Sequence, residues 1–266
     1  MGLNLGQNMR LNILISCYNG SVDGVGAMFQ PQRDDVRYVV SHQMSEDYSQ
    51  ACPPLSMDRE DVIYAPFRGR GISRNRNHCL DVVRAHSEVP GEEICLLADD
   101  DVTYLPDSFD KVLAAFREHP EISIAAFRIL TPQSQPPFKP YQDKSFVVNK
   151  IPLRGKYYFS SIELAFRLED IGKLRFDEDF GVGAAKWPEG GEETIFLSDC
   201  LKMGLKMRYF PIGMVIHGYM STGKSRKSVR KAQMMRAVAI RCRGPFSFEA
   251  ILASLRVLYR KLLRMG

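Results

Sequence analysis

The sequence has 266 residues, of which 45% are hydrophobic and 25% are charged, and its formal net charge is +5. These values are close to those of an average soluble globular protein, and they exclude a collagen-like repeat, low-complexity disorder and a disulfide scaffold. The length allows one large domain or two small ones with a substantial core, and no apolar run approaches the ~20 residues that cross a bilayer.

In the first half of the chain, short apolar runs alternate with segments of helical periodicity. The apolar runs predict buried strands at residues 11–16, 36–41, 62–65, 94–98 and 122–129. The periodic segments predict helices at residues 72–86 and 106–119, the second with Pro106 near its first position and Asp107 in its first turn. We therefore expect an α/β fold with a mainly parallel central sheet flanked by helices, and ligands at the carboxyl ends of its strands.

The second half is less regular. A proline-containing loop at residues 133–140 precedes strand-like segments at 146–148 and 161–167, a helix expected at 192–203 and closed by Gly204, and a last strand at 214–216. From residue 228 onward we expect two basic amphipathic helices, separated at Gly244 and Pro245.

The six cysteines, at positions 17, 52, 79, 95, 200 and 242, are scattered without C-x-x-C spacing. Most of them lie in apolar or helical patterns, which predicts reduced, mostly buried thiols. The N-terminus also lacks the basic-then-apolar pattern of a secretory signal. We therefore expect a cytoplasmic protein.

Charge is distributed unevenly along the chain. Residues 224–266 contain 12 basic residues and one acidic residue, Glu249, which gives a net charge of +11. The rest of the chain contains 24 basic and 30 acidic residues, a net charge of −6. We therefore expect a slightly acidic body and a basic helical extension with a separate task.

Three consecutive carboxylates, Asp99, Asp100 and Asp101, follow the strand expected at residues 94–98. Carboxylates this close repel one another unless a cation neutralises them. Alternation along a strand would put Asp99 and Asp101 on one side, where they could share a divalent ion. Oxygen ligands favour Mg²⁺ or Mn²⁺, with nucleotide phosphates completing the coordination shell. The alternative interpretation is a solvated acidic turn before a helix.

A second acidic pair, Glu192 and Glu193, follows two glycines and opens the helix expected at residues 192–203. One carboxylate could act as a general base beside a glycine-lined pocket, although acidic residues in a first turn also complement the helix dipole. Trp187, the single tryptophan, is either a platform for a sugar ring or a loop anchor. His217, at the end of the last expected strand, is either a strand-end residue or a further ligand for the acidic cluster.

Taken in order, these motifs resemble those of family 2 glycosyltransferases with the GT-A fold. The resemblance covers about residues 11–223 and rests on CYNG, GISRNRN, LLADDDV, a glycine-rich segment before GGEE, and VIH. It implies one GT-A domain over residues 9–223, followed by the basic extension over 224–266. Residues 9–129 would bind the nucleotide-sugar, and residues 130–223 would supply the acceptor and catalytic groups.

The resemblance also implies roles for individual residues. Asp99 and Asp101 match the D-x-D motif, which binds the ribose and the metal of a nucleotide-diphospho-sugar. Arg74 and Asn75 match the RN segment of the donor pocket, and His217 matches a histidine that often completes the metal–diphosphate site.

The acidic pair stands where the family often has Glu-Asp, and its second member, Glu193, is favoured as the base. Here a glutamate replaces the aspartate, so the choice between Glu192 and Glu193 stays open. The remaining candidates are assigned to nucleotide-sugar binding (Cys17, Tyr18, Asn19, Asp100) and to acceptor binding (Gly183, Trp187, Gly191). The first of these segments lacks the family's common Pro-Thr.

The implied activity is metal-dependent transfer of a sugar from a UDP- or GDP-type donor to a saccharide or lipid-linked acceptor, with Mn²⁺ or Mg²⁺ as cofactor. A metal and a cation such as Arg74 would stabilise the leaving diphosphate. One direct displacement inverts the anomeric configuration, and no nucleophile for a retaining route is apparent.

Two other classes of function compete with this one. Residues 218–225 match the P-loop pattern G-x-x-x-x-G-K-[ST], which would suit a nucleotide hydrolase, but no later strand ends in an aspartate for magnesium. A non-catalytic module that docks through its tail is the second alternative. Nucleic-acid binding is not expected, because the tail has no interleaved aromatic motif.

In the tail, apolar residues from Phe248 to Leu262 recur at helical spacing, and Arg256, Arg260 and Arg264 follow one another every four residues. This pattern suits in-plane binding to an anionic membrane, which would place the protein peripherally on the inner face of the cytoplasmic membrane. The alternative is a helix packed on the body with a solvated basic face.

Overall fold

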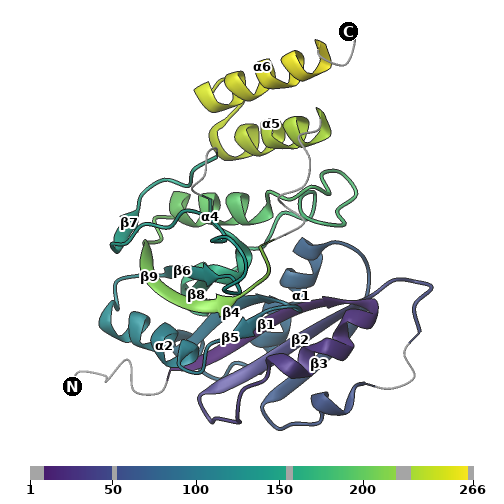
Figure 1. Ribbon diagram of the computed structural model, residues 1–266, viewed down its shortest axis with the longest axis vertical. Coiled ribbons are helices and arrows are strands. Elements are labelled where there is room, and N and C mark those ends of the chain that lie inside the picture. The colour runs from purple at the N-terminus through teal and green to yellow at the C-terminus, as the bar shows by residue number, and fades with distance from the viewer. Residues whose placement is uncertain (1–8, 50–52, 154–157, 220–228, 263–266) are drawn as a thin grey trace.

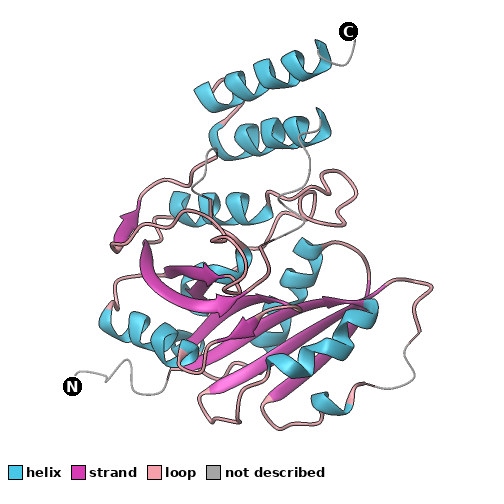
Figure 2. Cartoon of the chain, in the orientation of Figure 1, coloured by secondary structure: helices cyan, strands magenta, loops and turns pink. Residues whose placement is uncertain are grey.

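The computed structural model describes residues 9–49, 53–153, 158–219 and 229–262 (Figure 1). Within these residues, nine strands form one sheet that is covered by helices, and the last two helices stack beyond the helix that covers its upper part in this view (Figure 2). The mixed α/β architecture expected from the alternating pattern is confirmed.

The strands lie in the sheet in an order that differs from their order in the chain. From edge to edge they are β3 (Val62–Arg68), β2 (Val36–Met44), β1 (Arg10–Tyr18), β4 (Glu93–Asp99), β8 (Leu164–Arg167), β6 (Ile124–Leu130), β9 (Met207–Ile216) and β5 (Thr103–Tyr104), while β7 (Phe146–Val148) also pairs with β9. The pairings give β1, β2, β3, β4, β6 and β9 one direction and β5, β7 and β8 the opposite one. The sheet is therefore mainly parallel, as expected.

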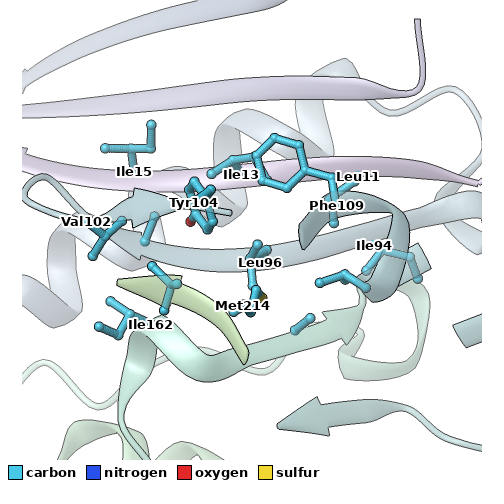
Figure 3. Packing of buried hydrophobic residues seen from close by; sticks show 14 of the residues in the cluster. Leu11, Ile13, Ile15, Ile94, Leu96, Val102, Tyr104, Phe109, Ile162 and Met214 are labelled. Carbon is cyan, nitrogen blue, oxygen red and sulfur yellow. The ribbon is translucent and has the colours of Figure 1, made fainter. Parts of the chain in front are cut away.

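The central strands are apolar on both faces because helices cover both faces. On one face, Leu11, Ile13 and Ile15 of β1 pack with Leu96 of β4 and with Phe109 (Figure 3). Phe109 belongs to α2 (Ser108–Glu118). This cluster closes the face of the sheet on which α2 lies.

On the other face, Leu14 and Cys95 pack against Leu80 and Phe196. Leu80 belongs to α1 (Ile72–His86) and Phe196 to α4 (Glu192–Lys202). A third cluster joins α4 to α5 (Val229–Arg243) and α6 (Phe248–Leu262). The remaining short elements are α3 (Leu168–Ile171), η1 (Asn19–Met28), η2 (Leu55–Met57), η3 (Pro90–Glu92) and η4 (Ser161–Glu163).

Several expected elements have different bounds; the strand-like segment expected at residues 161–167, for example, is a strand only at Leu164–Arg167, after η4 (Ser161–Glu163). Two further differences have a clear physical reason. The helix expected at residues 106–119 begins only at Ser108, whose N–H donates to the Leu105 carbonyl in a turn. The strand expected at residues 214–216 begins already at Met207, because Pro211 and Gly213 interrupt the apolar pattern without ending the strand. The five cysteines in the described residues are buried and free, as expected, and Cys52 lies outside them.

Among the described residues, no helix is long and apolar enough to cross a membrane. The parallel strands β1, β4 and β9 end at one edge of the sheet, since all three run in the same direction. That edge carries Asn19 after β1, Asp99 at the end of β4 and His217 after β9. The candidate site is therefore at the carboxyl end of the sheet, where the pattern predicted it.

Candidate active site

The three consecutive aspartates have three different partners. The Asp99 carboxylate accepts a hydrogen bond from Arg76 Nη2 over 3.3 Å, Asp100 accepts one from the Ser21 hydroxyl, and Asp101 Oδ2 lies 3.4 Å from His217 Nε2. The strand ends at Asp99, so the alternation that would place Asp99 and Asp101 on one side does not continue to Asp101. The described residues contain no group of three or more His, Cys, Asp and Glu side chains placed to hold a metal ion.

Asp101 and His217 are brought together by the pairing of β5 with β9, in which Thr103 stands opposite Ile216. His217 Nδ1 donates to the Gly218 carbonyl over 2.6 Å, which directs Nε2 toward Asp101. The hydrogen bond from His217 lowers the pKa of Asp101, and the same hydrogen bond raises the pKa of His217. One carboxylate and one imidazole nitrogen thus form a two-donor set for a divalent ion.

Arg76 is the residue that connects the end of β4 to the start of α4. Its Nη1 donates to Glu192 Oε1 over 2.9 Å and lies 3.9 Å from Glu193 Oε1, while its Nη2 contacts Asp99. The side chain is 3% exposed, and its guanidinium lies over the Phe176 ring. Burial opposes its charge, but Glu192, Asp99 and Glu193 outweigh burial and raise the pKa of Arg76 above its ordinary value.

The two glutamates at the start of α4 have different surroundings. Glu192 is buried, with Oε1 on Arg76 and with no hydrogen-bond partner for Oε2 among the described residues. Glu193 is partly open, with 19% of its side chain exposed. Burial and the neighbouring Glu192 raise the pKa of Glu193 to about 8. Glu193 is therefore the carboxylate of the pair that can hold a proton near neutral pH and still be reached from outside.

Helix α1 holds these groups in place because its polar side chains fasten it to the segment that leads into α4. Asn77 exchanges two hydrogen bonds with the backbone of Phe176, at 3.0 and 2.8 Å, and donates a third to Glu178. Ser73 donates to the Phe180 carbonyl over 2.6 Å, and the Ile72 N–H donates to the Val182 carbonyl. These contacts lie before and after Arg76 along α1, and they fix the position of Arg76 relative to Glu192.

Sequence reasoning missed Arg76, although the pattern contained a signal. Ile72, Arg76, Cys79, Leu80 and Val83 follow the spacing of one helix face, so a charged residue stands in an otherwise apolar stripe. A cation on such a stripe is buried and needs carboxylate partners.

The donor-pocket candidates on α1 lie in different environments. Arg74 is exposed, and its guanidinium lies against Gly69, where an added Cβ would come within 3.2 Å of it. Asn75 is buried and donates to the Cys17 carbonyl over 2.9 Å, so its amide fastens α1 to the end of β1. The structure therefore brings neither side chain into contact with the acidic cluster.

The candidates after β1 also have defined partners. The Cys17 thiol is buried, and burial raises its pKa well above its ordinary value. Asn19, with φ of 49°, exchanges hydrogen bonds with Ser45 at 2.9 and 3.1 Å, while Tyr18 is 43% exposed. Of these three residues, Tyr18 has the side chain that a ligand can reach most readily, and its N–H donates to the Ser21 hydroxyl that contacts Asp100.

The acceptor candidates lie in the segment before α4. Gly183, with φ of 82°, lies so close to Gly71 that an added Cβ would be 3.3 Å from its backbone. At Gly191, with φ of 97°, an added Cβ would be 2.6 Å from Val238 of α5. Trp187 stacks on Phe180, and its N–H donates to the Asp179 carbonyl. These contacts give all three residues packing roles, and their contact with an acceptor stays a prediction.

Comparisons with solved structures identify the fold. TarS residues 1–349 from S. aureus, solved with UDP, superimposes with a TM-score of 0.58 at 13% identity over 88% of this chain and 65% of that chain. The same protein with UDP-GlcNAc gives a TM-score of 0.57 at 12% identity over 95% and 72%. The mannosyltransferase PcManGT from Pyrobaculum calidifontis, with GDP-Man and Mn²⁺, gives 0.56 at 16% identity over 96% and 72%.

This chain therefore has the GT-A glycosyltransferase fold. No family model matches the sequence, and neither does any curated protein sequence. The chain spans about two thirds of the length of the TarS fragment solved with UDP. The P-loop-like segment at residues 218–225 lies largely outside the described residues, so that interpretation stays untested.

Proposed function

We propose that this protein is a glycosyltransferase that uses a nucleotide-diphospho-sugar donor and inverts the configuration at the transferred carbon. The observation that carries the proposal is the Arg76 contact set, which places the partly open Glu193 beside the acidic end of β4 in a GT-A fold. The solved neighbours with this fold bind UDP, UDP-GlcNAc or GDP-Man. UDP- and GDP-sugars are therefore the proposed donors.

In the proposed reaction, an acceptor hydroxyl oxygen attacks the anomeric carbon of the donor. The bond from that carbon to the diphosphate oxygen breaks, and the diphosphate leaves with the bonding electrons. The Glu193 carboxylate takes the hydroxyl proton, so the base and the leaving group lie on opposite faces of the sugar. A raised pKa makes Glu193 a stronger base than an ordinary carboxylate, which suits this role.

Arg76 is the proposed positioning residue. It holds Glu192 directly and compensates part of the negative charge that Asp99, Glu192 and Glu193 concentrate around it. Glu192 accepts the 2.9 Å hydrogen bond from Arg76, whereas Glu193 lies 3.9 Å from the guanidinium and keeps its carboxylate available for the acceptor. Asp100 and its Ser21 partner lie beside the exposed Tyr18, where the nucleoside of the donor is proposed to bind.

Asp101 and His217 are the residues that would hold a divalent cation. Two donors are fewer than a closed protein site needs, but they fit Mn²⁺ or Mg²⁺ when diphosphate oxygens and water supply the other ligands. When bound, the cation would neutralise the charge that develops on the leaving diphosphate. The Mn²⁺ in the mannosyltransferase neighbour supports a divalent cation as the cofactor.

The proposed acceptor is a saccharide or a lipid-linked saccharide. The experiment is a screen of UDP- and GDP-sugars with Mn²⁺, in which release of the nucleoside diphosphate is measured with and without simple acceptors. We expect slow hydrolysis of one donor that depends on the metal. Hydrolysis of ATP with Mg²⁺, and of no nucleotide-sugar, would instead favour the P-loop alternative.

A further inference from the structure

Helix α6 packs against α5 with small side chains. Ala250 and Ala253 are buried in the cluster shared with α5. Ser254 accepts a hydrogen bond from Arg236 Nε of α5 over 2.8 Å. Small and polar groups therefore attach α6 to α5, and the large apolar side chains of α6 are not needed for that contact.

Those large side chains are exposed instead. Five of them, which recur at helical spacing, are each between 50% and 75% exposed: Phe248, Ile251, Leu255, Leu258 and Tyr259. We call these five residues the α6 stripe. On a helical projection they lie on the side opposite Ala250 and Ala253. In Figure 1, α6 is the outermost layer beyond α5, so the helix is placed to present the stripe away from the body.

The charge around the α6 stripe is positive. Residues 246–266 contain four basic residues and one acidic residue, Glu249. Lys150 pairs with Glu249 over 2.8 Å, so the one carboxylate of the segment is already compensated from the body. Arg256 and Arg260 follow Glu249 along one edge of the helix, next to the stripe.

The arginines of α5 do not add to this surface in the same way, because the body already engages several of them. Arg241 pairs with Asp199 over 2.8 Å and with Asp177 over 3.2 Å. Arg230 pairs with Glu189, and Arg243 donates to the Ile151 carbonyl. The charge of the basic tail is thus divided, with part of α5 holding the helix to the body and α6 carrying charge beside an apolar stripe.

We propose that α6 lies in the plane of an anionic lipid bilayer, with the α6 stripe inserted among the acyl chains and Arg256 and Arg260 at the head groups. An exposed helix with an apolar stripe and adjacent cations has the chemistry of an interfacial helix. A second copy of this chain fits less well, because two α6 helices would bring cations together without a free carboxylate to pair with them. The proposal goes beyond the transfer reaction and does not depend on the identity of the donor.

The test is flotation of the full chain with phosphatidylcholine vesicles that contain phosphatidylglycerol. We expect the protein to float with these vesicles and to bind pure phosphatidylcholine vesicles at least about tenfold more weakly. A Leu255→Ser/Leu258→Ser variant should lose about tenfold or more in partitioning, and so should an Arg256→Glu/Arg260→Glu variant. The control is Leu55→Ser, a single change of the same type at an exposed leucine of η2, which should leave partitioning unchanged.

Donor binding and circular dichroism of each variant show whether the fold is intact. Failure of the unaltered chain to float with anionic vesicles would overturn the proposal. Equal behaviour of the stripe variant and Leu55→Ser would overturn it as well. Loss of a dimer in the stripe variant, without any change in vesicle binding, would assign the stripe to a second copy instead.

Discussion

Arg76 Nη1 and Glu192 Oε1 lie 2.9 Å apart, and both side chains are almost completely removed from solvent. This ion pair joins α1 to α4 across the carboxyl edge of the sheet. Asp99 and Glu193 complete the contacts of the same guanidinium. The pair therefore links the two helices. In the proposed function, it also positions the neighbouring base, Glu193.

Replacement of Arg76 by methionine is expected to lower the free energy of unfolding by about 3–5 kcal/mol, because it leaves buried carboxylates without their cation. Arg74→Met is the matched control, since Arg74 is exposed two residues away on the same helix, and it should change stability by less than about 0.5 kcal/mol. Urea unfolding of both variants measures the difference. Equal stability of the two variants would contradict the central place of Arg76.

The two glutamates of α4 are expected to separate in function. Glu193→Gln should reduce transfer by about 10²–10⁴-fold, because an amide cannot take the acceptor proton, and it should leave donor affinity nearly unchanged. Glu192→Gln keeps an oxygen for Arg76 and should retain most of the transfer rate. Product formation and donor titration on both variants measure the two effects. A fully active Glu193→Gln enzyme would place the base elsewhere.

The raised pKa of Glu193 predicts how stability depends on pH. The unfolded chain releases this proton near the ordinary value of 4.5, whereas the folded chain releases it near 8. Between these values the folded state holds more protons than the unfolded state, so a rise in pH lowers the free energy of unfolding. Wild-type protein should therefore lose stability relative to Glu193→Gln as the pH rises from about 5 to about 8.

Urea unfolding of wild type and Glu193→Gln across this range measures that difference. Asp99, Asp100 and Glu163, whose pKa values burial also raises, are present in both proteins, so the difference reports the Glu193 carboxyl together with its effect on the neighbouring Glu192 and Asp99. A difference in stability that stays constant with pH would show that Glu193 titrates normally.

Gly191 tests how α5 is attached to the body. Gly191→Ala should be destabilising both through its positive φ, at about 1–2 kcal/mol, and through contact with Val238, at about 1–3 kcal/mol more. Gly204→Ala has a similar φ of 84°, and no described residue comes within 4 Å of the added Cβ, so this variant measures the backbone effect alone. Thermal unfolding should rank Gly191→Ala clearly below Gly204→Ala. Equal melting temperatures would mean that α5 shifts to accommodate the added methyl group without a loss of stability.

Much of the fold could be predicted because buried parallel strands are continuous apolar runs. The run that contains Leu11, Ile13 and Ile15 is such a case, and the helix at residues 72–86 has the bounds that its periodicity predicts. The start of β9 was not predictable in this way, since Pro211 and Gly213 interrupt its pattern. Neighbouring strands, rather than local preference, extend β9 back to Met207.

The sequence predicted most of the residues of the candidate site but not which of them contact one another. The sequence indicates that Asp99, Asp101, Glu193 and His217 gather at one edge, and the structure brings Asp101 to His217. The partner of Asp99 comes from α1, 23 residues earlier in the chain, and only the tertiary structure identifies it as Arg76. Local spacing likewise gives no sign that Asn75 contacts the backbone of Cys17.

The most direct test of the proposed function is calorimetric titration of UDP and GDP into the full chain, with and without Mn²⁺. We predict that one of them binds in the presence of Mn²⁺ and that Asp101→Asn weakens this binding by at least about tenfold. Arg74→Met in the same titration shows how far the exposed arginine contributes. Absence of binding by both nucleotides, or binding that neither Mn²⁺ nor Asp101→Asn affects, would contradict a metal-assisted donor site at Asp101 and His217.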